Sequence, residues 1–340
     1  MKENKLENDK VLLDLKDVKT YFSIKKGILK RTVGYVKAVD DVNLKVYKGE
    51  TLGLVGESGC GKTTLGKSIL QLIKATDGEM NYQFEDGTKD LRKLSKKELD
   101  RARQKLQIVF QDPHSSLNPA FTIYQQLSDP LKKFGVKNRN ERIKIIGDLL
   151  ESVNMRREYM NRYPNEFSGG QRQRIGIARA LSVNPELVIC DEAVSALDVS
   201  IQAQVLNLLM KLKEERSLTY IFITHDLSVV EYISDRIAVM YLGRIVELAD
   251  ADELYYNKLH PYTQALLSAV YTADPDQKKA DRIILEGDVP SPSNPPSGCS
   301  FHPRCKHCME LCKNERPQLK EYNIDGKIHY VACHLMDTQN

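Results

Sequence analysis

A glycine-rich segment near the start of the chain carries the residue types that bind phosphate. It runs from Gly56 to Thr63, reads GESGCGKT, and fits the pattern Gly-x4-Gly-Lys-[Ser/Thr] of nucleotide-binding loops. Its glycines let the backbone curve so that consecutive N–H groups point at one anion. Lys62 would reach the β- and γ-phosphates, and Thr63 would bind Mg²⁺. The predicted nucleotide-binding residues here are Gly56, Glu57, Ser58, Gly59, Cys60, Gly61, Lys62, Thr63 and Thr64.

The segments on either side supply the context that this motif needs. Thr51–Val55 (TLGLV) is typical of a buried strand, and Thr64–Ile73 has apolar residues at helical spacing. The N-terminus of such a helix adds a partial positive charge that faces the phosphates. A flexible glycine-rich turn is the alternative, and the coincidence of Lys-Thr with a strand and a helix argues against it.

An acidic pair, Asp191-Glu192, follows a second apolar strand at Leu187–Cys190. Carboxylates at the C-terminal end of a strand suit Mg²⁺ and water chemistry. We expect Asp191 to hold the metal through water, and Glu192 to act as general base or to orient the attacking water. The alternative role is capping of the next helix, which Ser195 or Asp198 could perform instead.

The run Ser168-Gly169-Gly170-Gln171 begins another predicted helix. Ser168 is a suitable N-cap, and the two glycines offer bare N–H groups to an anion. Since the chain already has a phosphate loop, a second anion site makes sense if it serves a nucleotide held by another subunit.

Strands and helices alternate after residue 50, which predicts an α/β domain with a mostly parallel sheet. A surface helix is expected within 89–105, amphipathic helices within about 120–167, and a hairpin at Ile237–Leu248. The residues expected on one helix face are Ile143, Ile146, Leu149, Leu150 and Val153.

Three further segments lack such a pattern. Residues 1–10 are expected to form a disordered tail. The basic stretch Lys25–Lys37 is expected to be a solvated loop, and contact with a membrane-bound partner or with nucleotide phosphate is its alternative. Near residue 290 the sequence VPSPSNPPSG is typical of a Pro/Ser linker that starts a separate tail.

Composition restricts the class of protein. The formal net charge is +4 over 340 residues, so the balance of charge does not indicate a nucleic-acid partner. No stretch approaches the roughly 18 consecutive apolar residues of a membrane span. The polar start of the chain lacks the apolar region of a secretory signal. We therefore expect a cytoplasmic protein, whose cysteines would not form disulfides.

Together these segments resemble the ATPase subunits of ABC transporters. In that family each ATP lies between the phosphate loop of one subunit and a signature motif of the other, which Ser168–Gln171 matches. Gln111, in VFQDP, resembles the Q-loop glutamine, which contacts Mg²⁺ and links the site to the membrane subunit. Ser195–Asp198 resembles the D-loop at the dimer interface, and Asp198 is assigned to the ATP site. His225 resembles the switch histidine, which contacts the γ-phosphate.

The resemblance also assigns an aromatic residue near the first strand to stacking on adenine. Tyr21 is the candidate, with Phe22 and Tyr35 as rivals because the basic insertion blurs the alignment. The catalytic set that the resemblance implies is Glu192, His225, Lys62 and Gln111. The Mg²⁺ set that it implies is Thr63, Gln111 and Asp191.

Longer segments resemble one branch of the family. LGLVGESGCGKTT, IVFQDPHSSLNP, DEAVSALDVSIQAQVLNLL and HPYTQALLSAV resemble the second ATPase of oligopeptide and dipeptide importers. The implied fold is a RecA-like P-loop NTPase core with an antiparallel β subdomain and an inserted α-helical subdomain. The implied boundaries are 11–260 for the nucleotide-binding domain, about 111–180 for its helical part, and 261–340 for a Cys-rich C-terminal extension.

This branch also implies partners, location and activity. The chain would be a peripheral subunit on the cytoplasmic face of the cell membrane, with ATP and Mg²⁺ as cofactors. It would pair with a sibling ATPase in a heterodimer, contact two transmembrane permease subunits, and reach an extracellular peptide-binding protein through them. ATP hydrolysis would energise uptake of oligopeptides or dipeptides. A nickel or glutathione importer is the alternative, and a soluble ABC ATPase acting on ribosomes or DNA is a remote one.

Cysteines crowd into the last part of the chain. Cys299, Cys305, Cys312 and Cys333 follow the Pro/Ser linker, with several histidines nearby. Thiols this dense suggest a metal centre, and four cysteines suit either a [4Fe–4S] cluster or structural Zn²⁺. These cysteines also resemble the set that binds an iron–sulfur cluster in some members of this importer branch. Free thiols are the remaining alternative.

Overall fold

The computed structural model of the protein describes residues 10–28, 30–112, 116–268 and 283–338. The expected N-terminal tail, apart from Lys10, lies outside the described residues. The chain divides into two compact units, which are described one at a time. The described parts of the first unit are Tyr47–Thr51 and, without 113–115, Lys93–Ile223. The described parts of the second unit are Lys10–Val46 without residue 29, Leu52–Arg92, and the described residues from Thr224 onward.

The first unit is built around three parallel strands: β6 (Leu106–Val109), β7 (Leu187–Asp191) and β8 (Thr219–Ile223). Every residue of β7 and β8 is buried, which explains their uninterrupted apolar sequences. Asp191 lies opposite Ile223 in the register, so the acidic pair follows directly at the carboxyl edge of these strands. This edge is where ligands bind in open α/β sheets.

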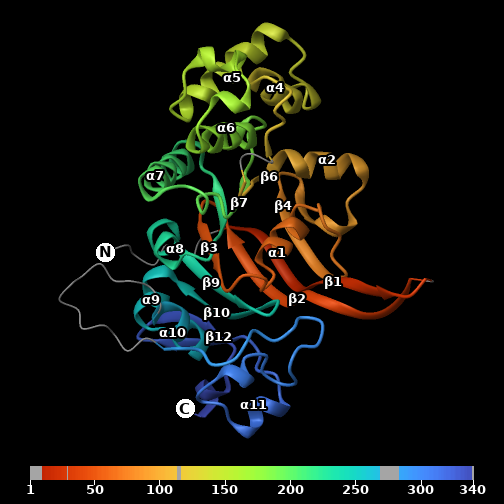
Figure 1. Ribbon diagram of the computed structural model, residues 1–340, viewed down its shortest axis with the longest axis vertical. Helices are drawn as coiled ribbons and strands as arrows, with labels where there is room; N and C mark the ends of the chain where they lie inside the picture. The colour runs from red at the N-terminus through yellow and green to blue at the C-terminus, as the bar shows by residue number, and fades with distance from the viewer. Residues whose placement is uncertain (1–9, 29, 113–115, 269–282, 339–340) are drawn as a thin grey trace, which may run out of the picture. The chain divides into compact units, whose positions relative to one another are not determined.

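Helices make up the rest of the first unit. They are α2 (Lys96–Lys105), α4 (Ile123–Lys133), α5 (Arg139–Ser152), α6 (Gly169–Leu181) and α7 (Val199–Arg216), with short 3₁₀ turns at Arg157–Asn161 and Pro164–Glu166. Helices α4, α5 and α6 gather into one group, shown in yellow-green in Figure 1. The predicted helical region within 120–167 is therefore confirmed. Ile143 is the exception on the predicted face, because 37% of it is exposed.

The predicted surface helix within 89–105 begins later than the sequence suggested. Its first residues complete strand β5 (Gly87–Asp90) and a 3₁₀ turn at Leu91–Lys93. Helix α2 then begins after Ser95, whose hydroxyl accepts a hydrogen bond from the Glu98 N–H in a capping box.

The second unit contains two groups of strands. One has the order β2-β1-β4-β5, from β2 (Arg31–Tyr47), β1 (Val11–Lys26), β4 (Asp77–Phe84) and β5. The other has the order β11-β12-β10-β9-β3, from β11 (Lys320–Ile324), β12 (Lys327–Val331), β10 (Arg244–Asp250), β9 (Arg236–Tyr241) and β3 (Thr51–Val55). Strand β3 pairs with β9 in parallel, whereas β9 and β10 form the predicted antiparallel hairpin.

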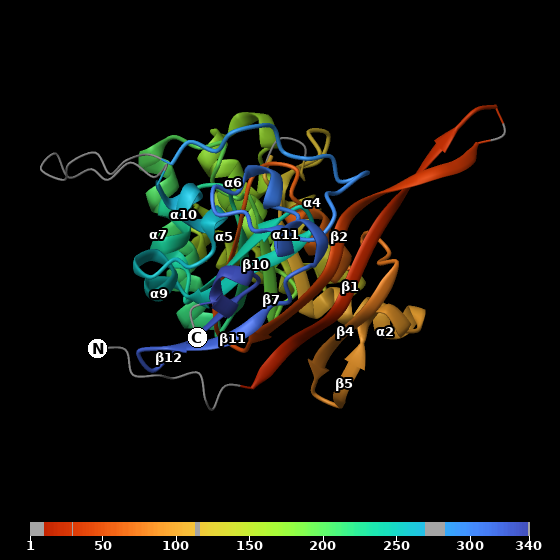
Figure 2. The same ribbon diagram turned by 90° about the horizontal axis from the view of Figure 1, so that it is seen from below.

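The expected solvated loop at Lys25–Lys37 is mostly strand. Strands β1 and β2 continue through its described residues and project as the long red ribbon of Figure 2. The side chains along it are nonetheless exposed, including the apolar residues Val33 and Tyr35. Backbone pairing between the two strands therefore extends this arm beyond the part that the core buries.

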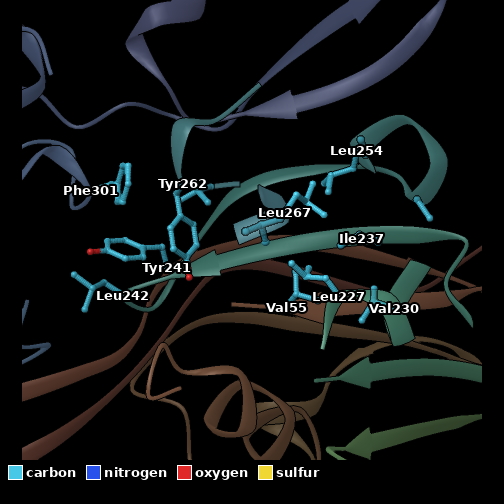
Figure 3. Packing of buried hydrophobic residues seen from close by; sticks show 14 residues of the cluster. Val55, Leu227, Val230, Ile237, Tyr241, Leu242, Leu254, Tyr262, Leu267 and Phe301 are labelled. Atoms are coloured by element: carbon cyan, nitrogen blue, oxygen red, sulfur yellow. The ribbon is translucent and has the colours of Figure 1, made fainter. Parts of the chain in front are cut away.

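Among its described residues the second unit has five α-helices: α1 (Lys62–Ile69), α8 (Leu227–Ile233), α9 (Ala251–Tyr256), α10 (Pro261–Ser268) and α11 (Glu310–Asn314). Figure 3 shows the apolar cluster that joins β3, β9 and β10 to α8, α9 and α10 and to Phe301 of the C-terminal segment. At its centre the ring of Tyr241 lies 4.6 Å from that of Tyr262 and 5.3 Å from that of Phe301, between ring centroids. The C-terminal segment is thus packed on the same core as the strand that precedes the phosphate loop.

A fully buried carboxylate ties the C-terminal strands to this core. Glu247 of β10 accepts hydrogen bonds from the backbone N–H groups of Leu259, at 2.7 Å, and His260, at 3.1 Å. Its side chain also lies 2.8 Å from Nε2 of His329 on β12. One buried carboxylate therefore satisfies three polar groups from two other segments, the turn at Leu259 and His260 and the strand β12.

We expect Glu247→Ala to lower the stability of the chain strongly, because it leaves two backbone N–H groups and an imidazole buried without their acceptor. The expected loss is about 3 kcal/mol, measured as a lower thermal midpoint. Glu247→Gln keeps one acceptor oxygen and should lose clearly less. Equal midpoints for the alanine variant and the unaltered protein would contradict this role for Glu247.

Candidate functional site

The phosphate loop connects β3 to α1 as the sequence predicts, and its curvature depends on glycine. Gly56 and Gly61 have φ angles of 150° and 110°. A Cβ at Gly56 would lie 2.1 Å from the carbonyl oxygen of Met240, and one at Gly61 would lie 2.0 Å from that of Ala38. Both oxygens belong to backbone, so the loop cannot accept a side chain at either position without moving a strand.

The interior of this loop has the donors that a polyphosphate requires. The Lys62 side chain is buried, and its Nζ donates to the carbonyl oxygens of Gly56, at 2.7 Å, and Glu57, at 3.0 Å. Helix α1 begins there with Gly61 as N-cap, no side-chain cap and no acidic residue in its first turn. An ammonium group and a helix N-terminus thus lie together, so the described residues fit an anion of this kind.

His225 belongs to the same unit as the phosphate loop. It follows Thr224, whose N–H donates to the carbonyl oxygen of Leu54 at 3.3 Å. Because Leu54 belongs to β3, this bond ties the start of the His225 segment to the strand that enters the loop. Asp226 then caps helix α8 through the Ser228 N–H, which leaves His225 in the turn between strand and helix, with its side chain exposed.

In the first unit the acidic pair lies beside Gln111. The Nε2 of Gln111 donates to Oε2 of Glu192 at 2.8 Å, although 81 positions separate the two residues. Asp191 is buried at the end of β7. Glu192 has a φ of 49°, a left-handed backbone conformation that a non-glycine residue adopts at a cost. Backbone strain of this kind is often found at functional positions, and here it occurs at the residue whose carboxylate accepts from Gln111.

The predicted signature segment begins helix α6 as expected. Ser168 is its N-cap and forms a capping box with Gln171, each side chain accepting from the backbone N–H of the other. A Cβ at Gly170 would lie 2.4 Å from Cγ2 of Ile201, in the first turn of α7. The glycine therefore allows the start of α6 to approach the start of α7 closely.

Helix α7 is capped by Asp198, as the sequence analysis allowed. The carboxylate accepts from the Ile201 N–H at 3.0 Å and from the Ser200 hydroxyl at 2.8 Å, and these bonds hold the pKa of Asp198 below its ordinary value. Asp191 and Glu192 are therefore not needed for capping. Ser195, Asp198 and the apolar Val199, which is 83% exposed, lie on the surface of the unit.

Tyr21 is held firmly by polar contacts. Its hydroxyl donates to Asp40, whose carboxylate also pairs with Arg244 at 2.7 Å. Burial raises the pKa of Tyr21, and the hydrogen bond to Asp40 raises it further. The rival aromatic residues Phe22 and Tyr35 lie farther along the exposed arm. Tyr21 is therefore the one of the three whose ring has a defined position beside the loop strands.

The four predicted cysteines line one pocket. Cys299, Cys305, Cys312 and Cys333 share it with His334, and the Cys299 N–H donates to the carbonyl oxygen of Cys312 at 2.8 Å. Burial raises the pKa of the Cys299 thiol to about 11 and that of Cys333 to about 12. All seven cysteines are free thiols.

The positions of these thiols do not by themselves make a metal site. In the part of the chain that the structure describes, no three His, Cys, Asp or Glu side chains are arranged so that they could hold one ion. The predicted [4Fe–4S] or Zn²⁺ centre is thus not supported by the geometry, although the donor types are those that such centres use.

Two residues that contact the loop were missed in the sequence analysis. The Tyr262 hydroxyl accepts a hydrogen bond from the Glu57 N–H at 2.9 Å. Arg304 forms two hydrogen bonds with the Glu57 carboxylate, at 2.7 and 3.0 Å. Neither residue belongs to a nucleotide-binding motif, and only the position of Arg304 beside Cys305 could have drawn attention to it.

The predicted site residues divide between the two units. The phosphate loop, Tyr21 and His225 lie in the second unit, whereas Gln111, the acidic pair and the segment from Ser168 to Gln171 lie in the first. Among the described residues, no helix has both the length and the apolar character that crossing a membrane demands.

Comparison with known protein families identifies two regions. Residues 39–195 match the family described as ABC transporter. Residues 246–312 match the family described as Oligopeptide/dipeptide transporter, C-terminal region. The second match includes Arg304 and three of the four pocket cysteines, so residues 246–312 are similar to the C-terminal region of oligopeptide and dipeptide transporters.

Curated relatives match nearly the whole chain. The oligopeptide transport ATP-binding protein AppF of Bacillus subtilis is 52% identical over 96% of this chain and 98% of its own. The oligopeptide transport ATP-binding protein OppF of Salmonella typhimurium is 49% identical, and the match covers 98% of each chain.

Solved structures of ATP-binding cassettes share the fold. The dimeric MJ0796 cassette in a post-hydrolysis state, bound to ADP and Pi, has a TM-score of 0.60 and 29% identity, covering 71% of this chain and 99% of that one. The phosphate loop, the acidic pair and the two family matches lead to one conclusion. The chain belongs to the ATP-binding proteins of ABC transporters, in the oligopeptide transport branch.

Proposed function

We propose that this chain hydrolyses ATP on the cytoplasmic face of the cell membrane and thereby drives uptake of oligopeptides or dipeptides by an ABC importer. The observation that carries the proposal is the phosphate loop, which brings together a buried ammonium group, a helix N-terminus and two positions that only glycine can occupy. The extended match to oligopeptide transport ATP-binding proteins supports the class of cargo.

The proposed reaction is transfer of the γ-phosphoryl group of ATP to water. Lys62 would bind the β- and γ-phosphate oxygens, and Thr63 and Asp191 would hold Mg²⁺, directly and through water. Mg²⁺, when bound, neutralises charge that develops on the phosphate oxygens. Glu192 would accept a proton from the attacking water, whose oxygen forms the new bond to phosphorus as the bond to ADP breaks. His225 would donate to the γ-phosphate.

Gln111 would control this base. Its amide donates to the Glu192 carboxylate, so it holds the side chain that must face water. In the family the glutamine at this position also contacts Mg²⁺ and the membrane subunit. Movement of the Gln111 segment would therefore change the position of the general base, which couples hydrolysis to the transporter.

A second ATPase subunit would complete the site. The start of α6 and the residues before α7 lie on the surface, and the exposed Val199 is an apolar residue that an interface would cover. We propose that Ser168–Gln171 and Asp198 meet the nucleotide of a sibling ATPase in a heterodimer, whose phosphate loop would hold it. Closure of this dimer by ATP would change the state of the attached membrane subunits.

We propose the helical part of the nucleotide-binding domain, about 111–180, as the contact with two transmembrane permeases. Phe121 and Tyr163 are large apolar residues that it leaves almost half exposed. An extracellular peptide-binding protein would deliver cargo to the permeases. The nucleotide-binding domain would then span 11–260, and the C-terminal extension 261–340.

We further propose that Cys299, Cys305, Cys312 and Cys333 hold a [4Fe–4S] cluster, with Zn²⁺ as the alternative. The support for this proposal is the donor type and the pocket that the four thiols share. Since their positions do not form a metal site, metal binding would require the thiols to lose protons and move closer together. The centre would stabilise the small extension and would take no part in hydrolysis.

The cargo can be tested in cells that lack the gene for this chain. Peptide uptake should fail in these cells and return when the gene is restored, whereas nickel and glutathione uptake should not change. Loss of nickel or glutathione uptake with normal peptide uptake would reassign the importer.

The variant Glu192→Gln should bind ATP normally and hydrolyse it at least about 100-fold more slowly, because the amide cannot accept the proton. The measurement is ATPase turnover of the assembled transporter in membranes. Glu214→Gln, a change of an exposed residue on α7, is the matched control and should turn over normally. Near-normal turnover of the Glu192 variant would remove this residue from the proposed role.

The variant Lys62→Ala should bind ATP roughly 10- to 100-fold more weakly, because it loses charged hydrogen bonds to the phosphates. Titration calorimetry with the purified full chain measures the affinity. Lys67→Ala, in the last turn of the same helix, provides the control and should keep the affinity. An unchanged affinity for the Lys62 variant would contradict the phosphate contact.

Protein purified without oxygen should contain iron and sulfide and absorb visible light if the pocket holds the cluster, or one zinc per chain if it holds the alternative. Changing Cys299 and Cys333 to Ser together should remove the metal, because two of four ligands are lost. Metal content unaffected by this double change, or absent from protein prepared in this way, would leave the cysteines as free thiols.

A further inference from the structure

Glu57, the second residue of the phosphate loop, is held through each of its polar groups. Its N–H donates to the Tyr262 hydroxyl, and its carbonyl oxygen accepts from Nζ of Lys62 at 3.0 Å. Its carboxylate receives both terminal nitrogens of Arg304 in a bidentate pair, at 2.7 and 3.0 Å. Two of these three partners, Tyr262 and Arg304, belong to the C-terminal extension, about 200 or more positions along the chain.

Arg304 lies in the chain between His302 and Cys305, two residues that line the cysteine pocket. It ends the 3₁₀ turn His302–Arg304, which begins with a hydrogen bond from the His302 N–H to the carbonyl oxygen of Cys299. Cys305 is the next residue, and it lines the same pocket. The turn that carries Arg304 is therefore connected to pocket cysteines before and after it, which gives a physical route by which a rearrangement of these thiols would shift the guanidinium group.

The ion pair is well protected from water. The Arg304 side chain is only 7% exposed and that of Glu57 is 27% exposed. The Arg304 guanidinium also lies 6.0 Å from the centre of the Tyr241 ring. Two parallel hydrogen bonds from a planar guanidinium group fix the orientation of the Glu57 carboxylate and offset its negative charge. A single contact from a lysine would offset the charge without fixing the orientation.

The negative charge of Glu57 affects nucleotide binding because this residue belongs to the phosphate loop. A carboxylate in a loop that binds a triphosphate repels the ligand unless a cation neutralises it. Arg304 supplies that cation from outside the loop and at the same time holds the curve of the backbone around Lys62. Loss of the guanidinium would leave an uncompensated negative charge beside the phosphates and a less ordered loop.

We propose that Arg304 is a positioning residue for nucleotide binding, through which the arrangement of the cysteine pocket sets the affinity for ATP. The inference deepens the proposed function and rests on ATP binding in the phosphate loop. It predicts a coupling between two parts of the chain for which no shared role has been assigned, the nucleotide site and the C-terminal thiols.

The first test is a double-mutant cycle on the purified full chain, with Mg-ATP titrated by calorimetry. Arg304→Met should weaken ATP binding about tenfold, because it leaves the Glu57 carboxylate without its partner. In the Glu57→Gln background the same Arg304→Met change should weaken ATP binding by less than about threefold relative to Glu57→Gln alone, because no carboxylate is left without its partner. Arg304→Lys should fall between Arg304→Met and the unaltered chain, because it keeps the charge without the planar fork.

Arg236→Met is the matched control, since Arg236 is a similarly buried arginine on β9, with 7% of the residue exposed against 9% for Arg304. It should change the thermal midpoint without changing the ATP affinity. The positioning role is overturned if the Arg304→Met variant binds ATP within about twofold of the unaltered chain. It is also overturned if Arg304→Met weakens ATP binding by the same factor whether residue 57 is Glu or Gln.

The second test asks whether the pocket acts through this pair. Cys305→Ser should weaken ATP binding in the unaltered background and have no effect in the Glu57→Gln/Arg304→Met background. An equal loss of ATP affinity in both backgrounds would show that the cysteine pocket does not act through the Glu57–Arg304 pair.

A kinetic measurement on the assembled transporter gives a further readout for Arg304. Arg304→Met should raise the KM for ATP and leave kcat nearly unchanged, whereas general misfolding would lower kcat.

The two hypotheses fail in different ways. The proposed function is wrong if the unaltered chain does not bind ATP, or if the Lys62→Ala variant binds ATP as tightly as the unaltered chain. If Lys62→Ala loses binding while Arg304→Met and Cys305→Ser keep it, the ATPase stands and only the coupling through Arg304 is wrong.

Discussion

The position of two backbone carbonyl groups constrains the phosphate loop and everything that depends on it. The oxygens of Ala38 on β2 and Met240 on β9 occupy the directions in which Gly61 and Gly56 would carry a Cβ. The turn after β9 adds a third constraint, because the Gly243 N–H donates to the Cys60 carbonyl oxygen at 2.8 Å and the Gly243 carbonyl oxygen accepts from Asp40. The loop is thus shaped by the strands around it before any ligand arrives, which lowers the ordering cost of binding.

The C-terminal segment packs against the end of β9, the same strand end that constrains the phosphate loop. Phe301 and Tyr262 complete the apolar cluster around Tyr241, which directly follows Met240, and this packing brings Arg304 to Glu57. Burial of three aromatic rings supplies the stabilisation, and the ion pair supplies the orientation. An extension held in this way cannot rearrange without affecting the strand end that supports the phosphate loop.

Residue patterns predicted the parts of the fold that depend on local sequence. The strand at Thr51–Val55, the helix N-cap at Ser168 and the hairpin through Gly243 were predicted because apolar periodicity and capping residues act within a few positions. The arm at Lys25–Lys37 was wrongly expected to be a loop, since backbone pairing between long strands leaves little trace in exposed polar sequence. Arg304 was missed for a related reason: its partner is 247 positions away, and no spacing rule links them.

At Glu192 the backbone and the side chain are held in different ways. Its φ of 49° is maintained by hydrogen bonds on both sides, from its own N–H to the Ile223 carbonyl oxygen and from the Ser195 N–H to its carbonyl oxygen. The backbone is therefore fixed by the strands, while the carboxylate accepts a hydrogen bond from the side-chain amide of Gln111. Because a hydrogen bond between two side chains is redirected more easily than a strand, control of hydrolysis is expected to act on the Gln111 contact and to leave the sheet unchanged.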